Sequence, residues 1–159
     1  MIGDARELSP SAMRLAARRL CIVMVCADDE READQIARLL TEFDNGCLVI
    51  YRRAEDLWSN GPAGKVALVI LASAHSPSGT RRTLKWLRER WPRCPVTIVG
   101  DSGCGDHEMA AREGGAIYLT RPVSHEQWQA VLNHAVGSAR RETDEMRERF
   151  EAPDASRPI

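Results

Sequence analysis

Short apolar runs alternate with amphipathic segments five times along the chain. The runs are rich in Val, Ile and Leu and too short to cross a membrane, which is typical of buried strands in a parallel sheet. They cover residues 20–27, 47–51, 66–72, 94–100 and 116–120. Amphipathic segments, which predict helices, follow at residues 30–43, 54–58, 80–91 and 106–113, and from residue 124 onward.

This alternation predicts βαβ units, and therefore an α/β fold with a parallel sheet and helices on both faces. Because crossovers are right-handed, few strand orders remain, and we expect a flavodoxin-like, doubly wound five-stranded sheet in the order 2-1-3-4-5. We expect an N-terminal extension over residues 1–19 and the main domain over residues 20–137. Residues 138–159 would add a helix extension and a disordered tail.

The last helix is predicted to be unusually long. Ser124 and Gln127 form a capping box at its start, and helical composition continues to about Phe150. One predicted face docks on the domain through Trp128, Val131, Leu132 and Ala135. An apolar stripe at a period near 3.5 residues also makes this helix an interface candidate through Trp128, Leu132, Ala139 and Met146. Glu142 interrupts that stripe, so the alternatives are a self-pairing or signalling helix and a single protruding one.

Composition narrows the class of protein. The chain has 159 residues, 43% hydrophobic, with a formal net charge of −1, so we expect no direct nucleic-acid binding. It has no apolar stretch of the roughly 18 residues that a membrane span needs, and its start lacks the apolar core of a signal peptide. We therefore expect a cytoplasmic protein. Its five cysteines form no C-x-x-C pair, and we expect no disulfides.

Three motifs appear in order on the predicted βα units. "ADDE" at 27–30 follows the first strand, "PVTIVG" at 95–100 forms the fourth, and "GGAIYLTRP" at 114–122 spans the fifth. Together they resemble the receiver domain of bacterial two-component response regulators, over roughly residues 20–137. The resemblance implies the flavodoxin-like fold and a role in signal transduction or a phosphorelay.

The resemblance also implies where a phosphorylation pocket would lie, and its key residues are changed. Ala72 falls at the phosphoacceptor aspartate, Gly100 at the phosphate-binding hydroxyl, and Arg121 at the lysine. The acidic pair would be Asp28 and Asp29, or Ala27 and Asp28 if the register shifts by one residue. A methyl group cannot attack phosphorus, so we expect a pseudo-receiver with no catalytic residue, no enzyme activity and no cofactor.

The acids after the first strand have two interpretations. Asp28, Asp29 and Glu30 could hold Mg²⁺, or they could simply favour a helix N-terminus. Without a carboxylate from the third strand, we expect no metal. Arg121 should then lie across the pocket and bond Asp28 or Asp29 in place of the cation, because its planar fork meets a carboxylate bidentately.

Other polar residues near the same sheet edge leave alternatives open. His75, Cys104, Asp106 and His107 are predicted in loops, where they could bind zinc or, for Cys104, react with oxidants; ordinary solvated or capping roles are the alternative. By the resemblance, Tyr118 matches the aromatic switch on the fifth strand. It could also be a plain sheet-edge aromatic.

The segment "TRRTLKWLRERWPR", residues 80–93, carries six basic residues and one acid. Helical spacing turns Trp86 away from the core, with Arg82 and Arg90 four residues to either side. An exposed Trp among arginines suits an interface. The alternative is a solvated face whose Trp is covered by Arg stems.

Taken together, the residues predict a phosphorylation-independent receiver that works through protein contact. We expect a homodimer and a further partner, either another signalling protein or an output domain, at the fourth helix, fifth strand and last helix. The chain would be a stand-alone adaptor or the regulatory part of a longer regulator. The alternative function is a small-ligand or redox sensor with an anion near Arg121. An enzyme on this fold is not expected, because the pocket strands offer no nucleophile–base pair.

Overall fold

A computed structural model describes residues 20–26, 30–43, 46–72 and 76–151. Five parallel strands form one sheet in the order β2-β1-β3-β4-β5, which confirms the predicted flavodoxin-like topology. The strands are β1 (Leu20–Val25), β2 (Gly46–Tyr51), β3 (Leu68–Leu71), β4 (Val96–Gly100) and β5 (Ile117–Thr120). The helices are α2 (Glu30–Leu40), α3 (Ala54–Ser59), α4 (Pro77–Arg90), α5 (Gly105–Glu113) and α6 (His125–Glu151).

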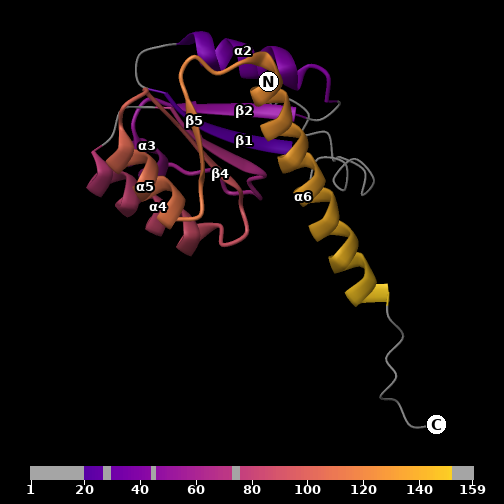
Figure 1. Ribbon diagram of the computed structural model, residues 1–159. Coiled ribbons are helices and arrows are strands. Elements are labelled where there is room, and N and C mark those ends of the chain that lie inside the picture. The colour runs from indigo at the N-terminus through magenta and orange to yellow at the C-terminus, as the bar shows by residue number, and fades with distance from the viewer. Residues whose placement is uncertain (1–19, 27–29, 44–45, 73–75, 152–159) are drawn as a thin grey trace, which may run out of the picture.

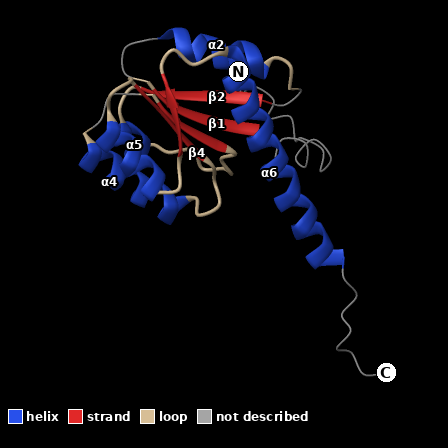
Figure 2. Cartoon of the chain, in the orientation of Figure 1, coloured by secondary structure: helices blue, strands red, loops and turns tan. Residues whose placement is uncertain are grey.

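Helices cover both faces of the sheet, with α2 and α6 on one side and α3, α4 and α5 on the other (Figure 1). The strands form the central layer (Figure 2). Alternate residues of one strand point to opposite faces. In β1, Ile22 and Met24 therefore join the core under α2 and α6, whereas Val23 and Val25 join the core under the other helices. Two apolar cores explain why the central strands read as uninterrupted apolar runs.

The predicted elements are confirmed, and most of their ends move by one to three residues. β4 begins at Val96 rather than Cys94, because Pro95 has no N–H to donate to the sheet. α2 ends at Leu40 instead of residue 43, and α4 begins at Pro77 instead of residue 80. The Ser76 hydroxyl accepts a hydrogen bond from the Gly79 N–H at 3.1 Å, so a segment that resembles a loop is a helix cap followed by proline at the first helical position.

The elongated last helix is confirmed. The Gln127 N–H donates to the Ser124 hydroxyl at 3.1 Å, and the Ser124 N–H donates to Gln127 Oε1 at 2.9 Å, so the predicted capping box forms. α6 then runs unbroken to Glu151 and extends past the sheet (Figure 1).

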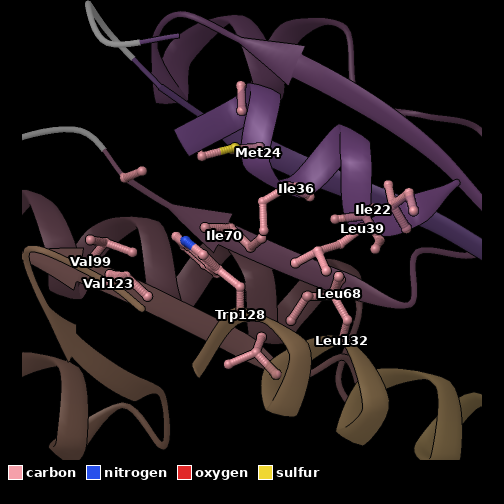
Figure 3. Close-up of a cluster of buried hydrophobic side chains, with 14 of the residues drawn as sticks. Ile22, Met24, Ile36, Leu39, Leu68, Ile70, Val99, Val123, Trp128 and Leu132 are labelled. Atoms are coloured by element: carbon pink, nitrogen blue, oxygen red, sulfur yellow. The ribbon is translucent and has the colours of Figure 1, made fainter. Parts of the chain in front are cut away.

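Trp128 and Leu132 were predicted both to dock on the domain and to be interface candidates. They lie in the core, so the second prediction is wrong. Both are fully buried, and Trp128 packs among side chains of the sheet and of α2 (Figure 3). The Trp128 indole N–H donates to Gln35 Oε1 at 3.1 Å. A buried Trp with its N–H satisfied fixes the start of α6 against the domain, so neither residue is available to a partner.

Candidate functional site

The carboxyl ends of β3, β4 and β5 bring together Ala72, Gly100 and Arg121, as their positions in the sequence predict. The Ala72 N–H donates to the Val25 carbonyl at 2.8 Å, and the Arg121 N–H donates to the Gly100 carbonyl at 2.9 Å. These bonds continue the ladders just past the strand ends. In an open α/β sheet this edge is where ligands bind. The side chain that β3 delivers there is the buried methyl group of Ala72.

The Arg121 guanidinium lies across this edge and, among the described residues, contacts three groups. Its Nε donates to Glu32 Oε1 at 2.9 Å, and one terminal nitrogen donates to the Ala72 carbonyl. The other terminal nitrogen lies 3.6 Å from Asp101 Oδ1. Burial by itself lowers the pKa of Arg121. The hydrogen bond and negative charge of Glu32, followed by those of Asp101, have the opposite effect and are stronger, so the pKa of Arg121 is raised overall. Arg121 is therefore held as a fixed cation at the centre of the edge.

Glu32 is the site residue that sequence reasoning missed. Its side chain is 11% exposed, and the pair with Arg121 joins α2 to the end of β5. A signal was present: Glu32 stands one turn before Ile36, on the apolar face of α2. An acid at such a position needs a cationic partner. Asp28 and Asp29 lie outside the described residues, so their pairing with Arg121 stays a prediction.

Tyr118 fills the space above Gly100. A side chain on Gly100 would collide with the Tyr118 hydroxyl, and its Cβ would lie only 2.7 Å from Tyr118 Cζ. The hydroxyl donates to the Asp101 carbonyl at 3.4 Å, and the ring meets His107 edge-to-face at 5.7 Å. Burial, followed by nearby negative groups, raises the pKa of Tyr118, and Arg121 opposes them. Tyr118 can therefore occupy this inward position only because residue 100 is a glycine.

A cavity of about 280 Å³ lies beside these residues, between the start of α5 and the end of β4. His107 is a buried residue of α5, in agreement with the helix predicted over 106–113 and not with the loop position considered for a zinc ligand, and its Nε2 lies 2.8 Å from Thr80 Oγ1. Cys104 is exposed at the start of α5, and His75 lies outside the described residues. Within the described ranges, no three His, Cys, Asp or Glu side chains are placed to share a metal ion. Cys21, Cys47, Cys94 and Cys104 carry free thiols.

Trp86 is half-buried in an aromatic cluster, which corrects the expectation that it points away from the core. Its ring lies 6.5 Å from that of Trp58 on α3 and 5.7 Å from that of Trp91, edge-to-face. Arg90 stacks over Trp91 at 5.9 Å, and Arg82 is exposed. The spacing within α4 could not reveal this cluster, because Trp58 comes from another helix.

Comparison with solved structures identifies the architecture. A response regulator receiver domain protein (CheY-like) from Methanospirillum hungatei aligns with 78% of this chain and 98% of its own, at 17% identity and a TM-score of 0.63. The fold is that of a receiver domain. The beryllofluoride-activated receiver domain of DrrB covers 75% of this chain and 98% of its own (18% identity, TM-score 0.62). A structure described as adenylate cyclase from Rhodopirellula baltica covers 84% and 99% (14% identity, TM-score 0.65).

Comparison of the sequence with known proteins finds only a partial match. No protein-family model matches the chain. Protein RcaC from Microchaete diplosiphon is 38% identical over 47 residues, which is 29% of this chain and only 7% of RcaC. In the described part of the chain, none of the helices has the length and apolar character to span a membrane.

Proposed function

We propose that this chain is a cytoplasmic, phosphorylation-independent receiver that signals through protein–protein contact, first of all as a homodimer, and has no enzyme activity. The observation that carries the proposal is the Arg121 hydrogen bond to the carbonyl of Ala72, the residue at the phosphoacceptor position. A receiver accepts a phosphoryl group on a carboxylate, and Ala72 has none. The cation that would steady the transferred group instead pairs with Glu32, inside the chain.

Two further features support the same proposal. Gly100 offers no hydroxyl to a phosphoryl oxygen, and the Tyr118 side chain occupies the space that a side chain at position 100 would need. Phosphoryl transfer depends on positioned metal ions and cations around the developing charge. At this edge, both Arg121 and Tyr118 are already engaged in contacts within the chain.

The direct test is intact-mass spectrometry after incubation with acetyl phosphate and Mg²⁺. The chain should gain no phosphoryl group under conditions that phosphorylate an ordinary receiver treated in parallel. The Ala72→Asp variant should also remain unmodified, because Arg121 and Gly100 are still unsuited to the phosphate. Stoichiometric modification of the wild-type chain would refute the proposal.

A second candidate function is a small-ligand or redox sensor. The cavity of about 280 Å³ favours it, because Arg121 and the exposed Cys104 both line this cavity. Native mass spectrometry of the purified protein tests this candidate. A bound small anion that is lost in Arg121→Gln would favour the sensor, whereas an unliganded mass favours the contact module.

A further inference from the structure

Two half-buried cysteines lie side by side at the amino end of the sheet. Cys21 of β1 and Cys47 of β2 are direct partners in the parallel ladder that joins these strands. Paired residues of a ladder point to the same face, and Cys21 packs against the core under α3, α4 and α5. The pair is separate from the site around Arg121 and from the cavity that Cys104 lines, because both of these lie at the carboxyl ends of the strands.

The spacing of the two strands allows a bond between the two sulfurs. Neighbouring strands lie about 4.7–4.9 Å apart. Disulfides usually join Cα atoms that are about 4.4–6.8 Å apart, so Cys21 and Cys47 can be bridged without a large movement of the backbone. The sequence could not show this pair, because the two cysteines come from different strands and form no C-x-x-C motif.

The two thiols already interact in the reduced protein. Burial, then the negative charge of Cys47 and a hydrogen bond with it, raise the pKa of Cys21 from 9.0 to about 11. A hydrogen bond that raises the pKa of a thiol stabilises its protonated form, so the Cys21 S–H donates to the Cys47 sulfur. The two sulfur atoms therefore face each other.

Cys94 lies on the same side of the sheet, but the strand order excludes it as the partner of Cys21. The Ala67 N–H, just before β3, donates to the Cys21 carbonyl at 2.8 Å. Cys94 precedes β4, which lies on the far side of β3 from β1. Two strand spacings, or about 10 Å, therefore separate Cys94 from Cys21. A disulfide does not reach over that distance.

The positions of the two strands give each thiol a different role. β2 is an edge strand, whereas β1 has a neighbouring strand on both sides (Figure 1). A reagent can therefore approach Cys47 from the open edge of the sheet. Cys21 holds its proton more firmly than an ordinary thiol, which makes it the poorer nucleophile. Cys47 is therefore the thiol that reacts first, and Cys21 is the thiol that closes the bond.

We propose that Cys21 and Cys47 form a reversible redox switch, which a low-molecular-weight disulfide such as oxidised glutathione converts from dithiol to disulfide. The Cys47 sulfur gives up its proton and attacks one glutathione sulfur; the glutathione S–S bond breaks, and the first glutathione leaves as a thiol with that proton. The Cys21 sulfur then gives up its proton and attacks the Cys47 sulfur, and the second glutathione leaves as a thiol. The chain loses two electrons and two protons, and one oxidised glutathione becomes two reduced ones.

The resulting bond should be easy to reduce again. The Cβ atoms of a disulfide are most often about 3.8 Å apart. Parallel side chains on neighbouring strands are held near the strand spacing, about 4.7–4.9 Å, so the bond forms under strain. Strained disulfides are the labile ones, which is the property that a reversible switch needs.

Peptide mapping by mass spectrometry tests the switch in the folded chain. The Cys104→Ser variant is incubated with oxidised glutathione, the remaining thiols are alkylated, and the digested chain is searched for disulfide-linked peptides. This background removes an exposed thiol that would form links between copies. We expect a Cys21–Cys47 link within one chain, a loss of mass equal to two hydrogen atoms, and full reversal by an excess of reduced glutathione.

Variants in the same background separate the two roles. Cys21→Ser should stop at the mixed disulfide and gain the mass of one glutathione on Cys47, whereas Cys47→Ser should form no link to Cys21. Cys94→Ser is the matched control, and it should form the Cys21–Cys47 link to the same extent as its parent. Closure of the mixed disulfide should also quicken as the pH rises from 7 to 9, because Cys21 must lose its proton first.

The outcomes that contradict the switch are equally distinct. Recovery of both cysteines as alkylated thiols after prolonged incubation would overturn the proposal, and so would a link that forms only in urea. A link from Cys21 to Cys94 in place of Cys47 would show that the pair is wrongly assigned. None of these outcomes bears on phosphorylation or on the homodimer, so the proposed function and the switch can fail separately.

Discussion

The two edges of the parallel sheet differ in where their polar and apolar groups find partners. At the carboxyl edge, Arg121 bonds Glu32 and the Ala72 carbonyl, and Tyr118 covers Gly100. At the amino edge, a cavity of about 340 Å³ lies between Pro95 and Ala139, and residues 143–151 of α6 are exposed. In an open α/β sheet the carboxyl edge is where ligands bind. Here Arg121 and Tyr118 at that edge are engaged in contacts within the chain, beside a cavity of about 280 Å³.

The largest expected effect comes from opening the carboxyl edge. Arg121→Ala should lower the free energy of unfolding by about 2 kcal/mol, because Glu32 is left as a nearly buried, unpaired acid. We take a value below the usual range for fully buried pairs, because the Arg121 side chain is 30% exposed. Urea denaturation measures the change. Adding Glu32→Gln to the same variant should restore part of the loss.

The matched control for this variant is Arg112→Ala. Arg112 pairs with Glu108 one turn away on α5, and its side chain is 73% exposed. Its removal should change stability by less than ~0.5 kcal/mol. Equal effects of the two substitutions would mean that the carboxyl edge is no more closed than the ordinary surface of the protein.

The next effect tests the space above Gly100. Gly100→Thr should cost about 1–2 kcal/mol, because the new side chain collides with Tyr118. In a Tyr118→Ala background the same substitution should cost much less, and the difference is the coupling that a double-mutant cycle reports. Gly64→Thr is the control, since a side chain there meets no atom within 4 Å. Additive costs would show that Tyr118 does not fill this space.

A pH effect sharpens the description of the amino edge. Cys94 lines the cavity between Pro95 and Ala139, and burial, partly opposed by Arg88, raises the pKa of its thiol from 9.0 to about 12. The unfolded chain loses this thiol proton near pH 9, whereas the folded chain keeps it until the pH approaches 12. The contribution of the buried, protonated thiol to stability is therefore complete below pH 9 and is lost as the pH rises towards 12. Unfolding free energies measured up to about pH 10 should therefore fall by up to roughly 1 kcal/mol per pH unit. Cys94→Ala should reduce that slope, and Cys21, whose pKa burial raises to about 11, should account for part of the remainder. An identical slope in both proteins would mean that the Cys94 thiol is exposed to water.

The smallest effect concerns the ion pair between α6 and the domain. Lys65→Met should lower stability by less than ~1 kcal/mol, because Lys65 is half-exposed and its pair with Glu142 is screened by solvent. Amide hydrogen exchange should nevertheless quicken around residues 138–142. The control is Arg147→Met, which removes the exposed pair between Arg147 and Glu151 near the end of α6. Unchanged exchange in Lys65→Met would show that the pair does not hold α6 in place.

The sequence alone predicts the elements and the order of the strands, because apolar periodicity and right-handed crossovers leave few choices. It also predicts the capping box of α6 and the buried face that starts at Trp128. These are features of neighbouring residues along one element. The start of α4 was missed because Ser76 and Pro77 resemble a loop until the cap is seen.

The contacts that define the two edges join distant parts of the chain, and sequence patterns do not report them. Arg121 and Glu32 are 89 residues apart, and Trp86 meets Trp58 across two helices. Glu142 looked like a defect in the apolar stripe of α6. The structure explains it, because Lys65 stands opposite. In each case the sequence shows a polar or aromatic residue that interrupts the regular pattern of a helix face. It does not show which distant residue that side chain contacts.

The most direct test of the central claim is the amide spectrum of the isotope-labelled protein during titration with beryllofluoride and Mg²⁺, which together mimic a phosphorylated aspartate. The DrrB receiver domain, whose beryllofluoride-activated structure shares this fold, is the positive control. We predict no saturable change in this chain, because Ala72 offers no carboxylate and Arg121 is engaged with Glu32. Saturable shifts at the carboxyl ends of β1, β3 and β5 would contradict the account.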